Sequence, residues 1–335
     1  MADQDAGALS QLRDRFVTEQ LAPWREERFE RARLEAEYDR LNQFTSICLF
    51  RLSGSDVTIV EKDPSCIVPP AFASRGACYF GHLADVGRAF PVDGTLIIAV
   101  DVQDEATDHR DIPVFSFQKK VGHRNPLLPD ADLIELSYLE RVEPDRLPYN
   151  DKEILATFAG STTGGGRITR DAVLGAGFPR LRAARYFAGR PEVDFRITSL
   201  VQCEPAAERL LREEGFGSAP LGWDFAYRGR FAVSLDGNGA ACARPAIILK
   251  SRCALIRYES DQRLYYSSGL RHGENCLVVA DDGEVVDIVR AERADPGLHQ
   301  PIALAGTRFA DQILSRAFSL SYTAALIAAF GTLVV

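Results

Sequence analysis

Strand-like and helix-like segments alternate along the second half of the chain. Short apolar runs typical of buried strands cover residues 154–161, 193–200, 230–237, 253–258 and 275–282. Segments with helical spacing lie between them, at residues 170–188, 204–215 and 241–251. Strand–helix–strand units at this spacing predict a parallel sheet covered by helices on both faces.

The first half contains the same two kinds of segment in a different order. A helical pattern covers residues 9–41, with a break at Pro23, and strand-like runs follow at 45–52, 56–62, 95–102 and 111–118. This alternation also indicates an α/β fold. A charged, proline-bearing stretch at 139–153 has the composition of a connection between domains. We therefore predict an N-terminal domain over 1–148, a C-terminal domain over 149–314 and a final helix over 315–335.

The final stretch, residues 317–335, contains no charged residue. This length is close to that of a membrane span, but the stretch contains Ser, Thr and Tyr and begins inside an ordinary helical pattern. We predict a helix packed on the protein and keep a peripheral membrane contact as the alternative. The first residues are polar and charged, which argues against a signal peptide and favours a cytoplasmic protein.

The composition excludes several classes of partner. The net charge is −8 and no basic block occurs, which argues against binding to a nucleic-acid duplex. The seven cysteines are scattered without a C-x-x-C pair, as expected for reduced thiols in a cytoplasm. The five histidines lack metal-ligand spacing, so we expect no metal. No G-x-G-x-x-G follows a strand, which disfavours a nicotinamide cofactor.

Two glycine-rich turns follow predicted strands, where ligands bind in parallel sheets. In the first, "FAGSTTGGGR" (158–167), Gly160 and Gly165 have P-loop spacing, but Gly166 and Arg167 stand where Lys and Ser or Thr are required. Hydroxyls in this turn can donate to a phosphate or a ribose, or can instead cap the next helix. The turn contributes the candidates Ser161, Thr162, Thr163 and Gly164.

The second turn, "DGNGAACAR" (236–244), combines tiny residues with one arginine. Small residues let a ligand touch main-chain N–H groups, and a guanidinium at the start of a helix adds a fixed positive charge. The pattern suggests a phosphate site, and its alternative is a tight turn into a buried helix. The candidates are Asp236, Gly237, Asn238, Gly239 and Arg244, with the N–H groups of 237–243.

Two carboxylates, Asp101 and Asp104, follow the apolar strand in "IIAVDVQDEATDHRD" (97–111). A carboxylate at the end of a strand can act as a general base if it faces a cleft, and it can equally cap a helix or lie in a loop. The companion ligands that would make a magnesium site convincing are missing.

Seven segments in order resemble blocks of glycosyltransferase family 90. They are "IIAVDVQD", "IPVFSFQKK", "LLPDADLIE", "FAGSTTGGGRITR", "PEVDFRIT", "RFAVSLDGNGAACAR" and "CALIRYESDQRLYYSSGLRHGENCLVV", and together they span about Leu96 to Phe318. The third block is closest to the bacterial branch. Ala159 stands where the family has an arginine, and Asn275 where eukaryotic members often have histidine.

The resemblance implies a GT-B architecture, with two Rossmann-like domains facing a cleft and a C-terminal helix packing back on the N-terminal domain. It implies an inverting, metal-independent transfer of glucose, xylose or galactose from a UDP-sugar to a hydroxyl of a glycan acceptor, in lipopolysaccharide or capsule assembly. The acceptor would be lipid-linked and used at the inner face of the inner membrane. The alternatives are a non-catalytic nucleotide- or glycan-binding protein and an epimerase-like enzyme.

The resemblance also suggests roles for residues of this chain. Asp104 matches the family's catalytic base, and Arg244 with the turn amides would hold the diphosphate, helped by Ser161, Thr162 and Thr163. Glu259 would accept hydrogen bonds from hydroxyls of the donor. The weaker candidates are Arg170 and Arg182, for the phosphates, and Asp101.

Overall fold

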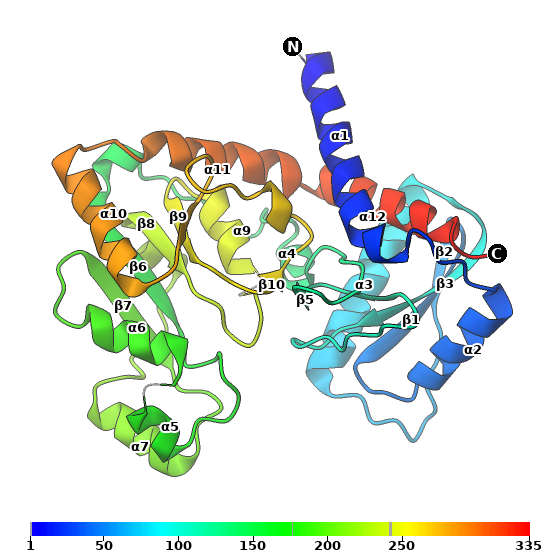
Figure 1. The fold of residues 1–335 in the computed structure, drawn as a ribbon, viewed down its shortest axis with the longest axis horizontal. Helices are drawn as coiled ribbons and strands as arrows, with labels where there is room; N and C mark the ends of the chain where they lie inside the picture. Colours follow the sequence, from blue (N-terminus) through cyan, green and yellow to red (C-terminus); the bar gives the residue numbers. More distant parts are fainter. Residues whose placement is uncertain (1, 176, 241–242) are drawn as a thin grey trace. The chain divides into compact units, whose positions relative to one another are not determined.

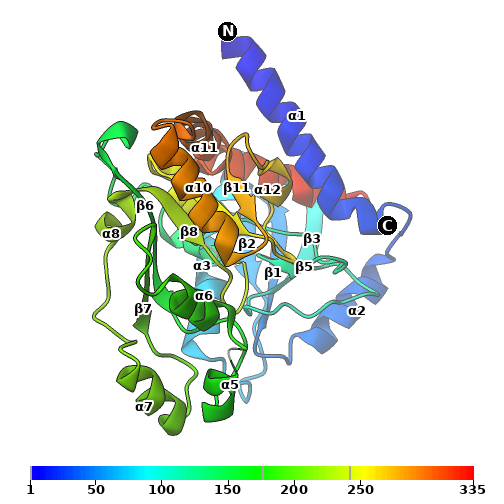
Figure 2. The ribbon, with the colours of Figure 1, turned by 60° about the vertical axis from the view of Figure 1, so that its left-hand side comes forward.

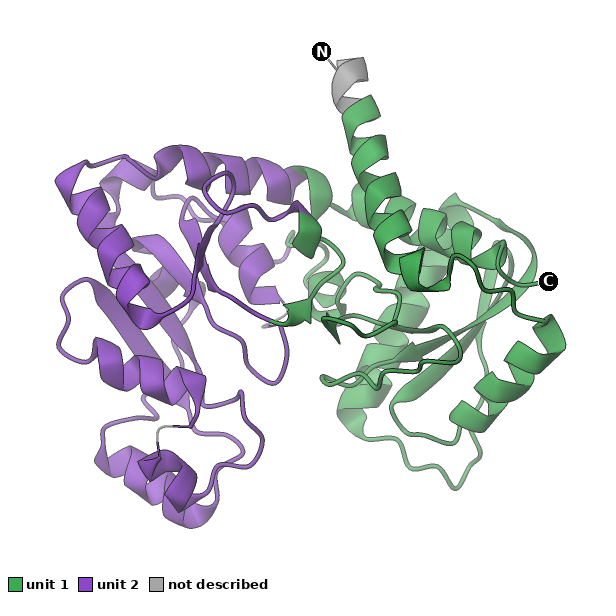
Figure 3. Ribbon diagram, in the orientation of Figure 1, with its two compact units in different colours: residues 1–140, 261–268, 312–335 green, residues 141–260, 269–311 purple. Residues whose placement is uncertain are grey.

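The computed structural model describes residues 2–175, 177–240 and 243–335. The chain forms two compact units, and each contains segments from distant parts of the sequence (Figures 1 and 3). Unit 1 comprises residues 1–140, 261–268 and 312–335, and unit 2 comprises 141–260 and 269–311. The last helix of the chain thus belongs to the same unit as its first, in agreement with the expected packing of the C-terminal helix on the N-terminal half.

Unit 2 is built on a five-stranded parallel sheet with the order β7–β6–β8–β9–β11. Its strands are β6 (Glu153–Ser161), β7 (Val193–Ser199), β8 (Gly229–Ser234), β9 (Ala254–Tyr258) and β11 (Leu277–Val279). Its helices are α5 (Arg170–Leu174), α6 (Pro179–Phe187), α7 (Pro205–Glu213), α8 (Trp223–Tyr227), α9 (Ala243–Lys250), α10 (Asp282–Ala294) and most of α11 (Gln300–Ile313), with a 3₁₀ turn at Tyr149–Asp151. The predicted parallel sheet with intervening helices is confirmed.

Helices cover both faces of this sheet. On one face, α6 and α10 (Figure 2) pack over residues such as Phe158, Phe231 and Ile256, while α8 and α9 pack on the other. The predicted helix over 170–188 is interrupted: α5 ends at Leu174 and α6 begins at Pro179, a residue that suits a first helical turn.

The strand order creates a topological switch point between β6 and β8. Numbered within unit 2, the order is 2-1-3-4-5, so the chain moves toward one edge after the first strand and toward the other after the second. The loops that follow β6 and β8 diverge at this point. In α/β proteins such divergence leaves a crevice at the carboxyl ends of the strands, where ligands bind. Both glycine-rich turns start here.

Unit 1 contains a mixed four-stranded sheet with the order β2–β1–β3–β4. Its strands are β1 (Ile47–Gly54), β2 (Asp56–Ile59), β3 (Val92–Asp101) and β4 (Val114–Ser116), and a separate two-residue pairing joins β5 (Lys119–Lys120) to β10 (Gln262–Arg263). Only β3 and β4 are parallel, because β1 pairs antiparallel with both β2 and β3. The sheet of unit 1 therefore departs from the fully parallel sheet that a Rossmann-like domain implies.

The helices of unit 1 are α1 (Ala2–Leu21), α2 (Arg31–Leu41), α3 (Pro70–Ala89), α4 (Ala131–Glu135) and α12 (Arg316–Gly331), with 3₁₀ turns at Ala22–Trp24 and Ser267–Gly269, the latter reaching the boundary with unit 2. The C-terminal helix α12 packs on α1 and α3, and its Phe330 ring lies 5.3 Å from that of Phe115 in β4. The uncharged stretch after Arg316 thus forms most of a core helix of unit 1. Among the described residues no single helix is long and apolar enough to span a membrane; α11 and α12 reach that length and apolarity only when taken together.

Candidate functional site

The two glycine-rich turns pack against each other at the switch point of unit 2. Gly164 has a φ of +115°, and a Cβ built on it would lie 3.2 Å from the carbonyl oxygen of Asp236 and 3.3 Å from that of Gly237. A Cβ on Gly237 would in turn lie 2.8 Å from Oγ1 of Thr163. Glycine is favoured at position 164 by its positive φ and by the close backbone of the second turn, and at position 237 by the close side chains of Thr163 and Arg180.

Arg180, from the first turn of α6, ties the two turns together. Its guanidinium donates to the carbonyl oxygens of Asp236 (3.0 Å) and Ser161 (3.2 Å) and to Oγ1 of Thr163 (2.8 Å). The side chain is buried, and burial lowers its pKa to about 10, against the opposing attraction of Asp236. Arg180 therefore fixes the geometry of the site and also places a positive charge in it.

Arg244, the second residue of α9, supplies a second guanidinium. Its Nη2 donates to the carbonyl oxygen of Ala159 (2.7 Å), and its guanidinium carbon lies 4.6 Å from the ring centroid of Phe158 and 5.8 Å from that of Trp223. Burial lowers the pKa of Arg244 to about 9, and repulsion by Arg180 acts in the same direction.

The two arginines place two positive charges in one site. Within the described ranges neither guanidinium forms an ion pair at 4.0 Å or less, although the carboxylate of Asp236 attracts Arg180 without pairing with it. The cost of holding two cations near each other and away from water is relieved when an anion binds between polar donors. The arrangement is thus suited to a phosphate or diphosphate at the carboxyl edge of a parallel sheet.

The hydroxyls of the first turn already have partners in the protein. Those of Ser161 and Thr163 lie 3.0 Å from each other, while Thr162 is fully buried and its Oγ1 is bonded to the backbone of Val201 at 2.8 and 2.9 Å. Thr162 therefore holds the end of β7 next to the turn, whereas Ser161 and Thr163 are partly exposed beside Arg180.

The other residues predicted for this site are distributed as follows. The carboxylate of Asp236 accepts a hydrogen bond from Ser260, the N–H of Gly237 donates to the carbonyl of Gly239 (3.0 Å), and Asn238 is partly exposed. Glu259 follows β9 directly and has an exposed side chain. Ala241 and Cys242, whose N–H groups belong to the predicted cradle, lie outside the described residues.

The two weaker arginine candidates do not join the site. Arg182 lies two positions after Arg180 on α6, is about half exposed, and forms an ion pair with Asp282 at 3.3 Å. Arg170 is exposed at the start of α5. Arg180 was not among the residues predicted for the site, although residues 180, 183, 184 and 187 form one helical stripe that is apolar apart from the arginine. A charge on the buried side of a helix was the signal for this residue.

The two acidic candidates lie in unit 1, where β3 ends. Asp101 is fully buried, and its carboxylate accepts hydrogen bonds from Gln103 (N at 3.2 Å, Nε2 at 2.9 Å) and from the N–H of Thr107 (3.1 Å). Asp101 therefore shapes the loop. The side chain of Asp104 is 41% exposed and accepts from Nη2 of Arg75 at 2.7 Å. It borders a small hollow together with Lys119, and Arg75 orients its carboxylate.

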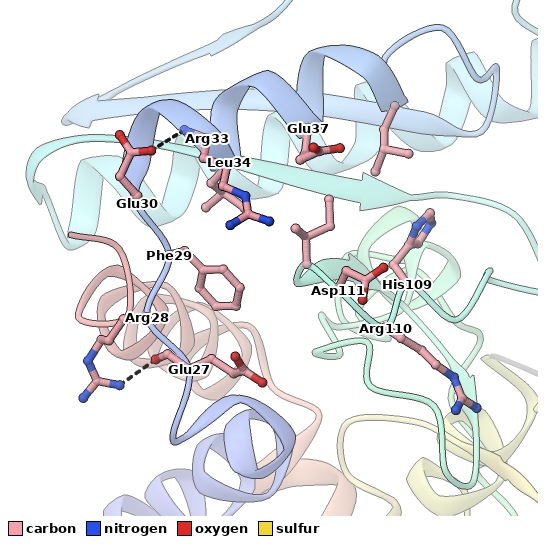
Figure 4. Close-up of a pocket in the computed structure, with 12 residues that line it drawn as sticks. Glu27, Arg28, Phe29, Glu30, Arg33, Leu34, Glu37, His109, Arg110 and Asp111 are labelled. Carbon is pink, nitrogen blue, oxygen red and sulfur yellow. Dashed lines mark hydrogen bonds between the residues drawn. The ribbon is translucent and has the colours of Figure 1, made fainter.

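Another hollow of unit 1, of about 550 Å³, lies between α2 and residues 109–112 (Figure 4). Acidic and basic side chains alternate around it, and among them Glu30 accepts from the N–H of Arg33 at 3.2 Å. This mixture of charges matches no single class of ligand. Among the described residues, no group of three His, Cys, Asp or Glu side chains could hold a metal ion.

Comparison with known proteins gives weak structural likenesses only. No family model matches the chain, and no curated protein matches it. Among solved structures, the chain is similar to the C-terminal domain of a glycosyl transferase group 1 family protein from Francisella tularensis, with 14% identity over 53% of this chain and 89% of that one. The TM-score of 0.28 does not establish a common fold.

Proposed function

We propose that this chain is a glycosyltransferase that uses a UDP-sugar as donor and a hydroxyl of a glycan as acceptor. The observation that supports this most is the pair Arg180 and Arg244, which forms no ion pair with a carboxylate in the described ranges and lies where β6 and β8 diverge. A nucleoside diphosphate carries the charge such a pair attracts and becomes more negative as the glycosidic bond breaks. The sequence resemblance to family 90 supplies the donor class and the GT-B assignment.

The proposed reaction is a direct displacement. The acceptor oxygen attacks the anomeric carbon, its proton passes to the carboxylate of Asp104, and the bond from the anomeric carbon to the diphosphate oxygen breaks with inversion. A positioned general base typically contributes about 10²–10⁴ to the rate. In this scheme Arg75 orients Asp104, as its hydrogen bond at 2.7 Å suggests.

The leaving UDP would be stabilised by the guanidinium of Arg244 and by turn amides, with no metal ion. Arg180 would hold the turns in position while adding charge, since most of its donors already bind the protein. Ser161, Thr163 and Glu259 would contact the donor, and Thr162 would act by fixing the turn. A lipid-linked glycan at the inner face of the inner membrane is the acceptor that we propose, in lipopolysaccharide or capsule assembly.

One observation favours a second function, nucleotide binding without catalysis. The carboxylate of Asp104 is ion-paired with Arg75, which is also what a purely structural aspartate would show. In that case unit 2 would bind UDP and no sugar would be released.

The test is a panel of UDP-glucose, UDP-galactose and UDP-xylose with the full chain. We expect UDP to raise the unfolding temperature, one UDP-sugar to be hydrolysed slowly without acceptor, and that hydrolysis to survive EDTA. Binding without hydrolysis of any donor would favour the second function. If neither UDP nor any UDP-sugar binds, the proposal is wrong, and loss of activity in EDTA would refute the metal-independent mechanism.

A further inference from the structure

A second pocket, of about 370 Å³, opens in unit 1 where β3 ends. We propose that it binds one uncharged pyranose ring. The residues that carry the argument are Phe44, Phe72, Asp101, Gln103, Thr107 and His109. They come from three places in the sequence: the segment before β1, the first turn of α3, and the loop that follows β3. The volume lies in the range of sites for small molecules.

Two phenyl rings give the pocket apolar surface. Phe44 is 53% exposed, and Phe72 is partly exposed on the first turn of α3. Leaving this much aromatic surface in water is unfavourable, and a ligand that covers it recovers that free energy. The C–H face of a pyranose is a flat apolar surface of matching size.

The polar side chains that line the pocket retain unused hydrogen-bonding capacity. The amide nitrogen of Gln103 donates to Oδ2 of Asp101 (2.9 Å) and to Oγ1 of Thr107 (3.2 Å). This arrangement leaves the amide oxygen of Gln103 and the hydroxyl proton of Thr107 available for a ligand. Acceptors and donors side by side suit neighbouring sugar hydroxyls, each of which both donates and accepts.

His109 also borders the pocket. Its Nε2 is buried and has no hydrogen-bond partner in the described part of the chain, and burial lowers the pKa of the imidazole although Asp101 and Asp108 oppose this effect. The neutral imidazole can donate from one nitrogen and accept at the other.

The charge of the lining excludes other ligand classes. Among the described residues no lysine or arginine borders this pocket, so a phosphate or a carboxylate would meet the buried Asp101 carboxylate and neutral groups there. The hollow in Figure 4, by contrast, is bordered by Arg28, Arg33 and several acids. An uncharged polyol with an apolar face is the class that fits both the rings and the polar edge.

We identify this pyranose ring as part of the acceptor sugar, and that identification rests on the proposed function. The binding of a pyranose to the pocket does not depend on it. We would titrate the full chain with methyl glycosides of glucose, galactose, mannose and xylose, using saturation-transfer NMR and calorimetry. We expect at least one glycoside to bind with a Kd of about 1–10 mM, the range of a single small contact surface. Phe44→Ala and Phe72→Ala should each weaken binding at least about tenfold.

The matched control is Phe80→Ala, because Phe80 is also on α3 and 37% exposed but does not border the pocket. It should leave glycoside binding unchanged, and all three variants should bind UDP as the wild type does. Absence of glycoside binding at about 50 mM, or wild-type binding by both pocket variants, would overturn the inference. If glycosides bind but the protein transfers no sugar, the proposed function alone is wrong. If it transfers sugar and both pocket variants keep the acceptor KM of the wild type, this inference alone is wrong.

Discussion

Replacing Arg244 by methionine should stabilise unit 2 and at the same time weaken UDP binding. Methionine has a similar length and can keep the contacts with Phe158 and Trp223, but it carries no charge. The free protein then no longer holds a desolvated cation beside Arg180. Opposite effects on stability and affinity are expected of a residue that serves a ligand rather than the fold.

The magnitude follows from the pKa of Arg244. A value of about 9 lies about 3.5 pH units below the ordinary 12.5 of an arginine, which corresponds to about 5 kcal/mol of unfavourable free energy for the charged form. Partial exposure reduces this penalty, and the unpaired carbonyl of Ala159 costs about 1–2 kcal/mol in the variant. We expect a net gain of about 1–2 kcal/mol in the free energy of unfolding.

The loss of affinity is set by charged hydrogen bonds to phosphate. Each contributes about 1.5–3 kcal/mol, so the Kd for UDP should rise about 10- to 100-fold. Unfolding in urea would measure the stability of wild type and variant, and calorimetry the affinity for UDP. Arg182→Met is the control, since Arg182 lies on α6 in a half-exposed ion pair and should change both quantities little.

Two results would refute the reasoning. If Arg244→Met lowers the free energy of unfolding by more than about 1 kcal/mol, the guanidinium stabilises the fold and its charge is not unfavourable in the free protein. If UDP binds to the variant as tightly as to the wild type, the anion site does not include Arg244.

Three further predictions concern the base, the pH dependence and the turn. Asp104→Asn should abolish sugar transfer while calorimetry finds UDP affinity unchanged; lost UDP binding would mean that Asp104 supports the structure instead. Folding lowers the pKa of Arg244, so above about pH 9 the unfolded chain binds one more proton than the folded protein. The free energy of unfolding, measured in urea, should therefore rise from pH 8 to about pH 10, while the UDP affinity, measured by calorimetry, should fall. Arg244→Met should flatten both trends. Gly164→Ala should lower the free energy of unfolding in urea by about 1–3 kcal/mol and reduce UDP affinity, because the new Cβ would crowd Asp236. The control Gly166→Ala, also at positive φ but with no atom within 4 Å of the new Cβ, should cost less. Equal effects of the two variants would show that the contact with Asp236 is unimportant.

The elements of unit 2 could be predicted from the sequence because its central strands are largely buried. Buried parallel strands are continuous apolar runs, and each is separated from the next by a helical segment with its own apolar stripe. Local patterns therefore specify the strands and helices of the unit. The meeting of the turns at 160–166 and 236–239 followed from their position after strands, but their direct backbone contact depends on the order β7–β6–β8, which no local pattern encodes.

Unit 1 was less predictable because several of its strand pairings are non-local. The antiparallel pairing of β1 with β2 joins strands separated only by a tight turn, whereas β5 and β10 are two residues long and lie far apart in the sequence. Such short pairs leave no periodicity to detect. Likewise, no pattern in the sequence indicates that Arg75 in α3 orients Asp104.

The division of the chain determines the order in which the units can be completed during synthesis. Unit 2 ends at Asp311, whereas unit 1 requires Phe330, which packs on Phe115 of its sheet. Translation proceeds at about 5–20 residues per second, so α12 is synthesised on the order of ten seconds or more after residue 140. During this time the apolar surface of unit 1 that α12 covers is exposed. The N-terminal part of this protein is therefore the last to finish folding, and it is the part in which chaperones should find their binding sites.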